Sequence, residues 1–122
     1  MKMFPGADFF YKVVAKLNNR FYSIYDSHCE YKVGHIKYEE VKPNKQGGYF
    51  VYKDVKNAIF ADIAYKEGGN FLAPRSIIKV ICWGEPLSYG NKLCYPFILP
   101  VLDLGLPMGY KSNPKQCIQL TQ

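Results

Sequence analysis

The feature that most constrains the fold is the run at residues 11–17, where side chains alternate between two faces with a period of two. Asn18-Asn19 separates this run from residues 20–26, a second aromatic and β-branched stretch, and asparagine accepts the positive φ of a tight turn. The sequence therefore predicts a β-hairpin. One side of its first strand holds Lys12, Val14 and Lys16, and the other holds Tyr11, Val13, Ala15 and Leu17.

A change of period after residue 53 predicts a helix. Val55, Ala58, Ile59 and Ile63 recur at spacings of three and four residues, as on the buried face of a helix. Asp54 suits the positive end of a helix dipole, and Gly68-Gly69 marks the end of the helical pattern. The sequence predicts one main helix over about residues 54–66.

The other apolar runs predict strands on both sides of this helix. We expect strands at residues 30–33, 35–41, 49–52, 76–83 and 93–101. Pro96 and Pro100 direct the last of these toward a sheet edge. The expected fold is α+β: a small single domain, residues 1–122, with a twisted antiparallel sheet packed against the one helix. An extended tail is expected from about residue 105.

The charge of the chain indicates an acidic partner. Its 122 residues carry a formal net charge of +6 and include eleven tyrosines. Such a surface attracts acidic proteins, nucleic acid or anionic lipid. Lysines provide nearly all of the positive charge, because Arg20 and Arg75 are the two arginines, and this disfavours sequence-specific reading of nucleic acid.

The basic side chains cluster with tyrosines in one stretch. This pattern predicts a noncatalytic binding or assembly module that docks on an acidic macromolecule, for example a cytoskeletal filament. Single-stranded nucleic acid is an alternative partner, since aromatic rings between lysines stack on bases. The predicted binding residues are Lys32, His35, Lys37, Tyr38, Lys42 and Lys45.

The cysteines indicate packing rather than metal binding or catalysis. Cys29, Cys82, Cys94 and Cys117 form no C-x-x-C pair, and Cys82 lies inside an apolar run. The adjacent His28 and Cys29 point to opposite faces of a strand. We therefore expect no metal, no cofactor and reduced thiols in a cytoplasmic or similar reducing compartment. No stretch is long and apolar enough to predict a transmembrane segment.

One part of the chain resembles the ADP-ribosyltransferase-like fold. Residues 47–90 contain a Gly-Gly pair, an aromatic strand, a helix and a second apolar strand, in the order found in that family. The resemblance implies a nicotinamide-nucleotide pocket with Tyr22, Tyr49 and Phe60 in its wall. Tyr25 and Glu85 are the candidate catalytic residues, Glu85 because it leaves the end of a buried strand.

The transferase motif itself is not matched. Where the family places its catalytic carboxylate, this chain reads Asn91-Lys92-Leu93. A lysine cannot stabilise a developing oxocarbenium charge. The resemblance therefore implies a divergent domain that keeps the shape of the family without its transfer chemistry, and a noncatalytic function is favoured over an enzymatic one.

Overall fold

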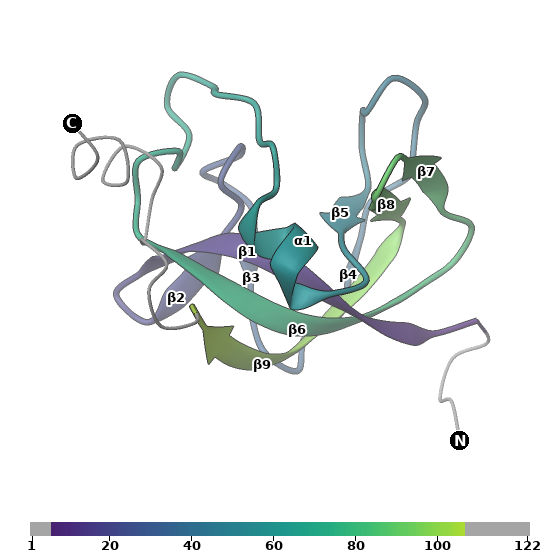
Figure 1. The fold of residues 1–122 in the computed structure, drawn as a ribbon, viewed down its shortest axis with the longest axis horizontal. Coiled ribbons are helices and arrows are strands. Elements are labelled where there is room, and N and C mark those ends of the chain that lie inside the picture. The colour runs from purple at the N-terminus through teal and green to yellow at the C-terminus, as the bar shows by residue number, and fades with distance from the viewer. Residues whose placement is uncertain (1–5, 107–122) are drawn as a thin grey trace.

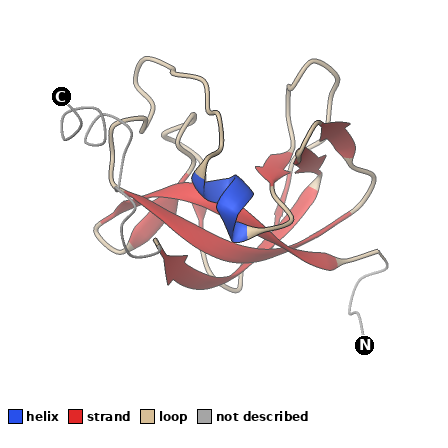
Figure 2. Ribbon diagram, viewed as in Figure 1, coloured by secondary structure: helices blue, strands red, loops and turns tan. Residues whose placement is uncertain are grey.

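Two antiparallel sheets form the molecule, of which the computed structural model describes residues 6–106 (Figures 1 and 2). The larger sheet has the order β3-β2-β1-β6-β9-β4, and the smaller has the order β5-β8-β7. The strands of the larger sheet are β1 (Asp8–Leu17), β2 (Arg20–Tyr22), β3 (Glu30–Tyr31), β4 (Lys37–Tyr38), β6 (Arg75–Trp83) and β9 (Phe97–Gly105). Those of the smaller sheet are β5 (Tyr49–Val51), β7 (Leu87–Tyr89) and β8 (Lys92–Tyr95).

The predicted α+β class is wrong, because the described chain is mainly β. Its one helix, α1, spans only Val55–Ile59, not residues 54–66. Asp54 does cap it, accepting a hydrogen bond from the backbone N–H of Asn57 at 2.8 Å. Residues 61–66, beyond Phe60, have no regular secondary structure, and the apolar Ile63 packs on the same cluster as Ala58 from this segment. The helical spacing was therefore produced by two different local structures that share one buried cluster.

The predicted hairpin is confirmed. β1 pairs with β2 so that Leu17 faces Arg20, which leaves a two-residue turn. Asn18 and Asn19 have φ values of 53° and 62°, as a type I′ turn requires. The predicted strand at 76–83 is also confirmed as β6, which pairs with β1 on one edge and with β9 on the other.

Both faces of the central strand β1 are covered, as the two core clusters show. On one face, Phe10 and Val14 pack with Ile78, Val80 and residues of the smaller sheet. On the other, Val13 and Ala15 pack with the helix and the segment that follows it. Lys12 belongs to the first face. A lysine is therefore placed between two layers of the fold.

The smaller sheet is attached to β1 by a single bridge. The N–H of Tyr11 donates to the carbonyl of Tyr52 at 2.8 Å, and the N–H of Tyr52 donates back at 2.9 Å. The same edge of β1 pairs with β2 in its C-terminal half. The two sheets therefore diverge along one strand.

The remaining strand predictions are corrected in detail. The run at 93–101 is divided at Pro96 into β8 and β9, and β9 lies between β6 and the two-residue β4 rather than at the edge. The β7–β8 hairpin, with Gly90 at φ 65° in its turn, was not predicted. β3 and β4 are shorter than expected. Most of the predicted tail, residues 107–122, lies outside the described residues.

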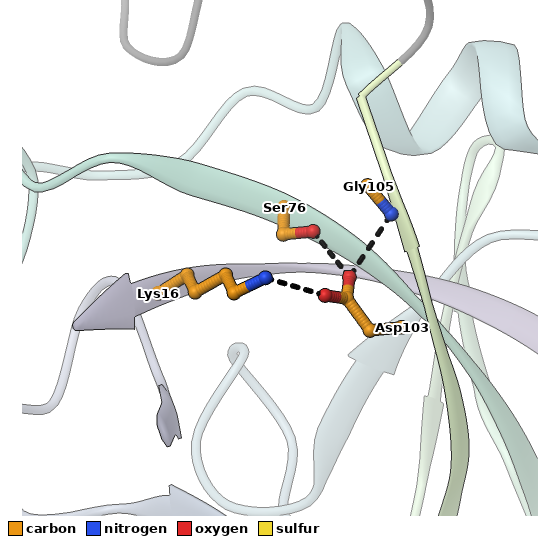
Figure 3. A network of polar contacts seen from close by, with 4 residues as sticks. All are labelled: Lys16, Ser76, Asp103 and Gly105. Carbon is orange, nitrogen blue, oxygen red and sulfur yellow. Dashed lines mark hydrogen bonds and ion pairs between the residues drawn. The ribbon is translucent and has the colours of Figure 1, made fainter. Parts of the chain in front are cut away.

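A polar network connects the three long strands of the larger sheet (Figure 3). Asp103 of β9 accepts hydrogen bonds from the ammonium of Lys16 at 2.7 Å, the hydroxyl of Ser76 at 2.5 Å and the N–H of Gly105 at 2.9 Å. Burial raises the pKa of the Asp103 carboxyl, but these three donors outweigh it and the net pKa is lowered. The carboxylate is thus satisfied within the fold.

Candidate functional site

A cavity of about 600 Å³ opens where the two sheets diverge. We call it the Lys12 pocket. Its inner wall comes from β1, β3 and β5, and its outer wall comes from residues 23–29, 45–48 and 61–66 together with Lys92 of β8. Figure 1 shows the segment after α1 and the loop before β5 on the same side of β1. The volume is that of a site for a small organic molecule.

Lys12 is the central polar residue of this pocket. Its Nζ donates a hydrogen bond to the carbonyl oxygen of Phe50 at 2.8 Å and lies 5.4 Å from the centre of the Tyr31 ring. The side chain is half-buried, and its residual exposure is toward the pocket that it lines. Neither of the ion pairs among residues 6–106 includes it. The amine therefore has a carbonyl and aromatic rings around it, but no carboxylate partner.

Burial controls the ionisation of the groups around Lys12. It lowers the pKa of the Lys12 amine, and repulsion from Lys92 lowers it further, although the thiols of Cys29, Cys82 and Cys94 act in the opposite direction. Burial also raises the pKa of Cys82 to about 12 and that of Cys94 to about 11. These thiols stay protonated at neutral pH, so they are not nucleophiles.

Aromatic rings form much of the inner wall. Tyr31 and Tyr49 meet edge to face with ring centres 6.1 Å apart, and both are almost fully buried. Burial raises the pKa of both hydroxyls, so each remains a neutral hydrogen-bonding group. Phe50 and Tyr52 add two further rings. The wall therefore suits a flat apolar body.

Lys12 and Lys92 set the charge at the inner end of the pocket. The ammonium of Lys92 lies 5.1 Å from the centre of the Phe50 ring, whose backbone carbonyl binds Lys12. Burial lowers the pKa of Lys92, and repulsion from Lys45 lowers it further. The carboxylates of the lining, Asp26, Glu39 and Asp62, all belong to exposed residues. Positive charge therefore predominates at the inner end and mixed charge at the mouth.

The Gly47-Gly48 turn in the pocket lining brings the backbone close to neighbouring residues. Gly47 and Gly48 both have φ of 72°, and the carbonyl of Gly47 accepts a hydrogen bond from the Cys94 thiol at 3.3 Å. A Cβ on Gly48 would clash with Cys94 and Val41. Glycine is required here both for the left-handed backbone and for the close approach.

The residues predicted to dock an acidic partner lie at two places. Lys37 and Tyr38 form β4 beside Ile98 and Phe97 of β9, and Lys32 and His35 lie in the preceding loop. Lys42 and Lys45 lie in the turn before β5, where Lys45 reaches over the ring of Tyr89. All six except Lys37 are exposed. Of these residues only Lys45 lines the Lys12 pocket.

The residues implied by the transferase resemblance are brought together only in part. Tyr25 and Tyr49 line the Lys12 pocket, whereas Tyr22, Phe60 and Glu85 do not. Glu85 is exposed between β6 and β7. The acids that line the pocket together with Tyr25 and Tyr49 are instead Asp26, Glu39 and Asp62.

Sequence reasoning missed Lys12, although a signal was present. The strand is rich in apolar residues on both sides, which is typical of a central strand covered on both faces. This pattern indicates that a lysine in such a strand can be buried. Lys12 was instead assigned to the same class as Lys16, on the polar side of a half-exposed hairpin.

Comparisons with known proteins found no match. No family model, no curated protein and no solved structure is similar to this chain. Within residues 6–106, no three histidine, cysteine or acidic side chains are placed to hold a metal ion. Over the same residues, no helix is long and apolar enough to cross a membrane. The proposals below therefore rest on the pocket and its residues.

Proposed function

We propose that this domain binds a small, flat organic anion in the Lys12 pocket. The observation that carries the proposal is the Lys12 amine, which lies among aromatic rings with one carbonyl partner and no carboxylate. An ammonium has three donors. One of them is used by Phe50, so the amine can also bind a ligand oxygen.

The charges favour an anion over a neutral ligand. Lys92 repels Lys12 and Lys45 repels Lys92, and this repulsion adds to the lowering of the pKa values of Lys12 and Lys92 by burial. A carboxylate or phosphate placed between them would replace repulsion with attraction. It would also form charge-assisted hydrogen bonds, which are stronger than neutral ones.

The shape of the pocket favours a flat ligand. Tyr31, Tyr49 and Phe50 line the pocket beside its charged end, and Phe50 is the one of the three that is partly exposed. An aromatic or conjugated body would bury its faces against these rings, while its anionic group would reach the lysines.

A matched pair of probes tests the proposal. We expect 2-naphthoate to bind and to perturb the amide NMR signals of Lys12, Tyr49 and Phe50, whereas the uncharged 2-naphthamide binds at least about tenfold more weakly, a difference of about 1.4 kcal/mol. Lys12→Met should weaken naphthoate binding by a similar factor, because methionine keeps the length of the side chain and removes its charge.

Lys53→Met is the control variant. Lys53 is exposed and does not line the pocket, so this substitution removes one positive charge from the surface without changing the site. Equal binding of naphthoate and naphthamide, or equal losses in the two variants, would show that the pocket does not recognise anions.

A nicotinamide nucleotide belongs in the same titration. It is the ligand implied by the resemblance to ADP-ribosyltransferases, and it combines flat rings with phosphates. Tyr25 and Tyr49 are in place for it, but Tyr22, Phe60 and Glu85 lie outside the pocket. Binding that depends on Lys12 and Tyr49 but not on Glu85 would assign it to the Lys12 pocket without a role for the acid.

Docking on an acidic macromolecule is a second proposal. It is supported by the exposure of Lys32, His35, Tyr38, Lys42 and Lys45. Lys32→Ala combined with Lys42→Ala should weaken binding to polyglutamate, and a single-stranded oligonucleotide in place of polyglutamate tests the nucleic-acid alternative. Binding to either polymer should fall steeply with salt. Salt-independent binding would contradict both.

A further inference from the structure

Among the described lysines of the Lys12 pocket, Lys12 combines two properties that distinguish it from a simple anion-binding residue. It lines the cavity with its Nζ on the carbonyl of Phe50, another lining residue, and it has no carboxylate that would hold it as an ammonium. By contrast, Lys45 and Lys66 are exposed at the mouth. Burial lowers the pKa of this amine, and an amine that has lost its proton has a free electron pair and is a nucleophile.

The surroundings of Lys12 hold such an amine in place. One N–H of Lys12 donates a hydrogen bond to the carbonyl of Phe50 at 2.8 Å, so the side chain reaches from β1 to β5. The amine of Lys92 lies near the Phe50 ring and donates a hydrogen bond to the backbone carbonyl of Asp62 at 3.4 Å. A nucleophile at the inner end of the pocket is therefore accompanied by a second cation that can hold an anionic group.

We propose that the ligand of the Lys12 pocket is an anionic aldehyde, which Lys12 captures as an imine while Lys92 pairs with its anionic group. This inference rests on the proposed function, because it places a narrower class of ligand in the same pocket. The lysine acts by covalent capture, and no further transformation of the ligand is included.

The capture balances without an added oxidant or reductant. The electron pair of the neutral amine attacks the carbonyl carbon to form a C–N bond, and the proton lost from nitrogen goes to the former carbonyl oxygen. The resulting carbinolamine loses its hydroxyl group as water and leaves a C=N bond. Burial of the inner wall limits the return of water, which favours the imine.

The proposal is tested by reductive trapping with 4-formylbenzoate on the whole chain at pH 7. Cyanoborohydride, added as the reductant, transfers hydride to the imine and makes the adduct permanent. Peptide mapping should find the adduct on Lys12 at least about tenfold above Lys53, because the pocket holds the anionic aldehyde beside Lys12 and a lowered pKa leaves more of its amine neutral. The uncharged 4-formylbenzamide should lose most of this selectivity.

Naphthoate separates anion binding from capture, because it has a carboxylate but no aldehyde and so forms no imine. Lys12→Arg should lose the trapped adduct, because arginine forms no imine under these conditions. Uniform labelling of all lysines would overturn the inference. Naphthoate binding without a Lys12 adduct would overturn it and leave the proposed function intact. A Lys12 adduct with equal yields from the two aldehydes would support capture and contradict the anionic ligand.

Discussion

Strand β1 places two lysines on the same face, Lys12 in its middle and Lys16 near its C-terminal end, and the fold treats them differently. Lys16 forms an ion pair with Asp103 at 2.7 Å, and Ser76 and Gly105 complete the shell of that carboxylate (Figure 3). Lys12, four residues earlier, donates to a backbone carbonyl and faces the pocket. The first lysine is satisfied by the fold, and the second is only partly satisfied.

This difference separates a structural site from a candidate functional one. A buried charge is tolerated when its partners are complete, and an incompletely paired charge costs stability. The Asp103 network has its counter-charge and its donors within the sheet. No carboxylate of the described fold balances the charge of the Lys12 amine. An anionic ligand would supply this missing counter-charge. Stability measurements can therefore test the comparison directly.

The largest expected effect is at the Lys16 end. Asp103→Asn removes the counter-charge of Lys16 and replaces one acceptor oxygen with a donor group, so Ser76 or Lys16 loses its partner. We expect the free energy of unfolding to fall by about 2 kcal/mol. Urea denaturation at pH 7 measures it. No change would show that the network does not stabilise the three strands.

A change of opposite sign in the free energy of unfolding is expected at Lys12. Lys12→Met removes a poorly paired charge and keeps an apolar stem, so the free energy of unfolding should rise by about 1 kcal/mol after the loss of the hydrogen bond to Phe50. Lys16→Met should instead lower it, by less than about 1 kcal/mol, because Lys16 is 38% exposed. Losses of equal size in both variants would remove the distinction between the two lysines.

The smallest effect is in the pH dependence. The pKa of Lys12 is lowered in the fold from its ordinary 10.5, so the unfolded chain binds more protons between the lowered value and 10.5. In that range, the Lys12 contribution to stability rises with pH. The advantage of Lys12→Met should therefore shrink between pH 7 and pH 9.5, measured as a difference between the two chains.

Taking the difference between chains removes other titrations from this measurement. The pKa values of Cys82 and Cys94 are raised to about 12 and about 11, so their stabilisation is lost as the pH rises from their unfolded values toward these folded ones. Cys29, Tyr31 and Lys92 also face Lys12. These groups are present in both chains. A difference that grew with pH would contradict a lowered Lys12 pKa.

Part of the fold followed from local signals. The alternation at 11–17 and the Asn-Asn turn predicted the first hairpin, and the apolar run at 76–83 predicted β6. These features depend on backbone preferences that act over a few residues. The helix prediction failed because Ile63 reaches the same cluster as Ala58 by a different backbone path, and spacing alone does not distinguish the two.

The candidate site was predicted less well than the fold. Tyr25 and Tyr49 were identified, but as parts of a pocket whose other predicted members lie elsewhere. Lys12 was assigned to a polar face because the sequence does not show that β5 and Tyr52 lie against the edge of β1. That contact joins residues 41 positions apart in the chain, beyond the reach of any local pattern.

The sequence by itself determined that the chain builds antiparallel strands, with a tight asparagine turn, a buried central strand and an excess of lysine. The tertiary structure alone decided which lysine is paired and which faces a cavity. Both lie on one face of one strand, where local preferences are the same. Their difference comes from long-range packing: β9 brings a carboxylate to Lys16, and β5 brings a carbonyl and aromatic rings to Lys12.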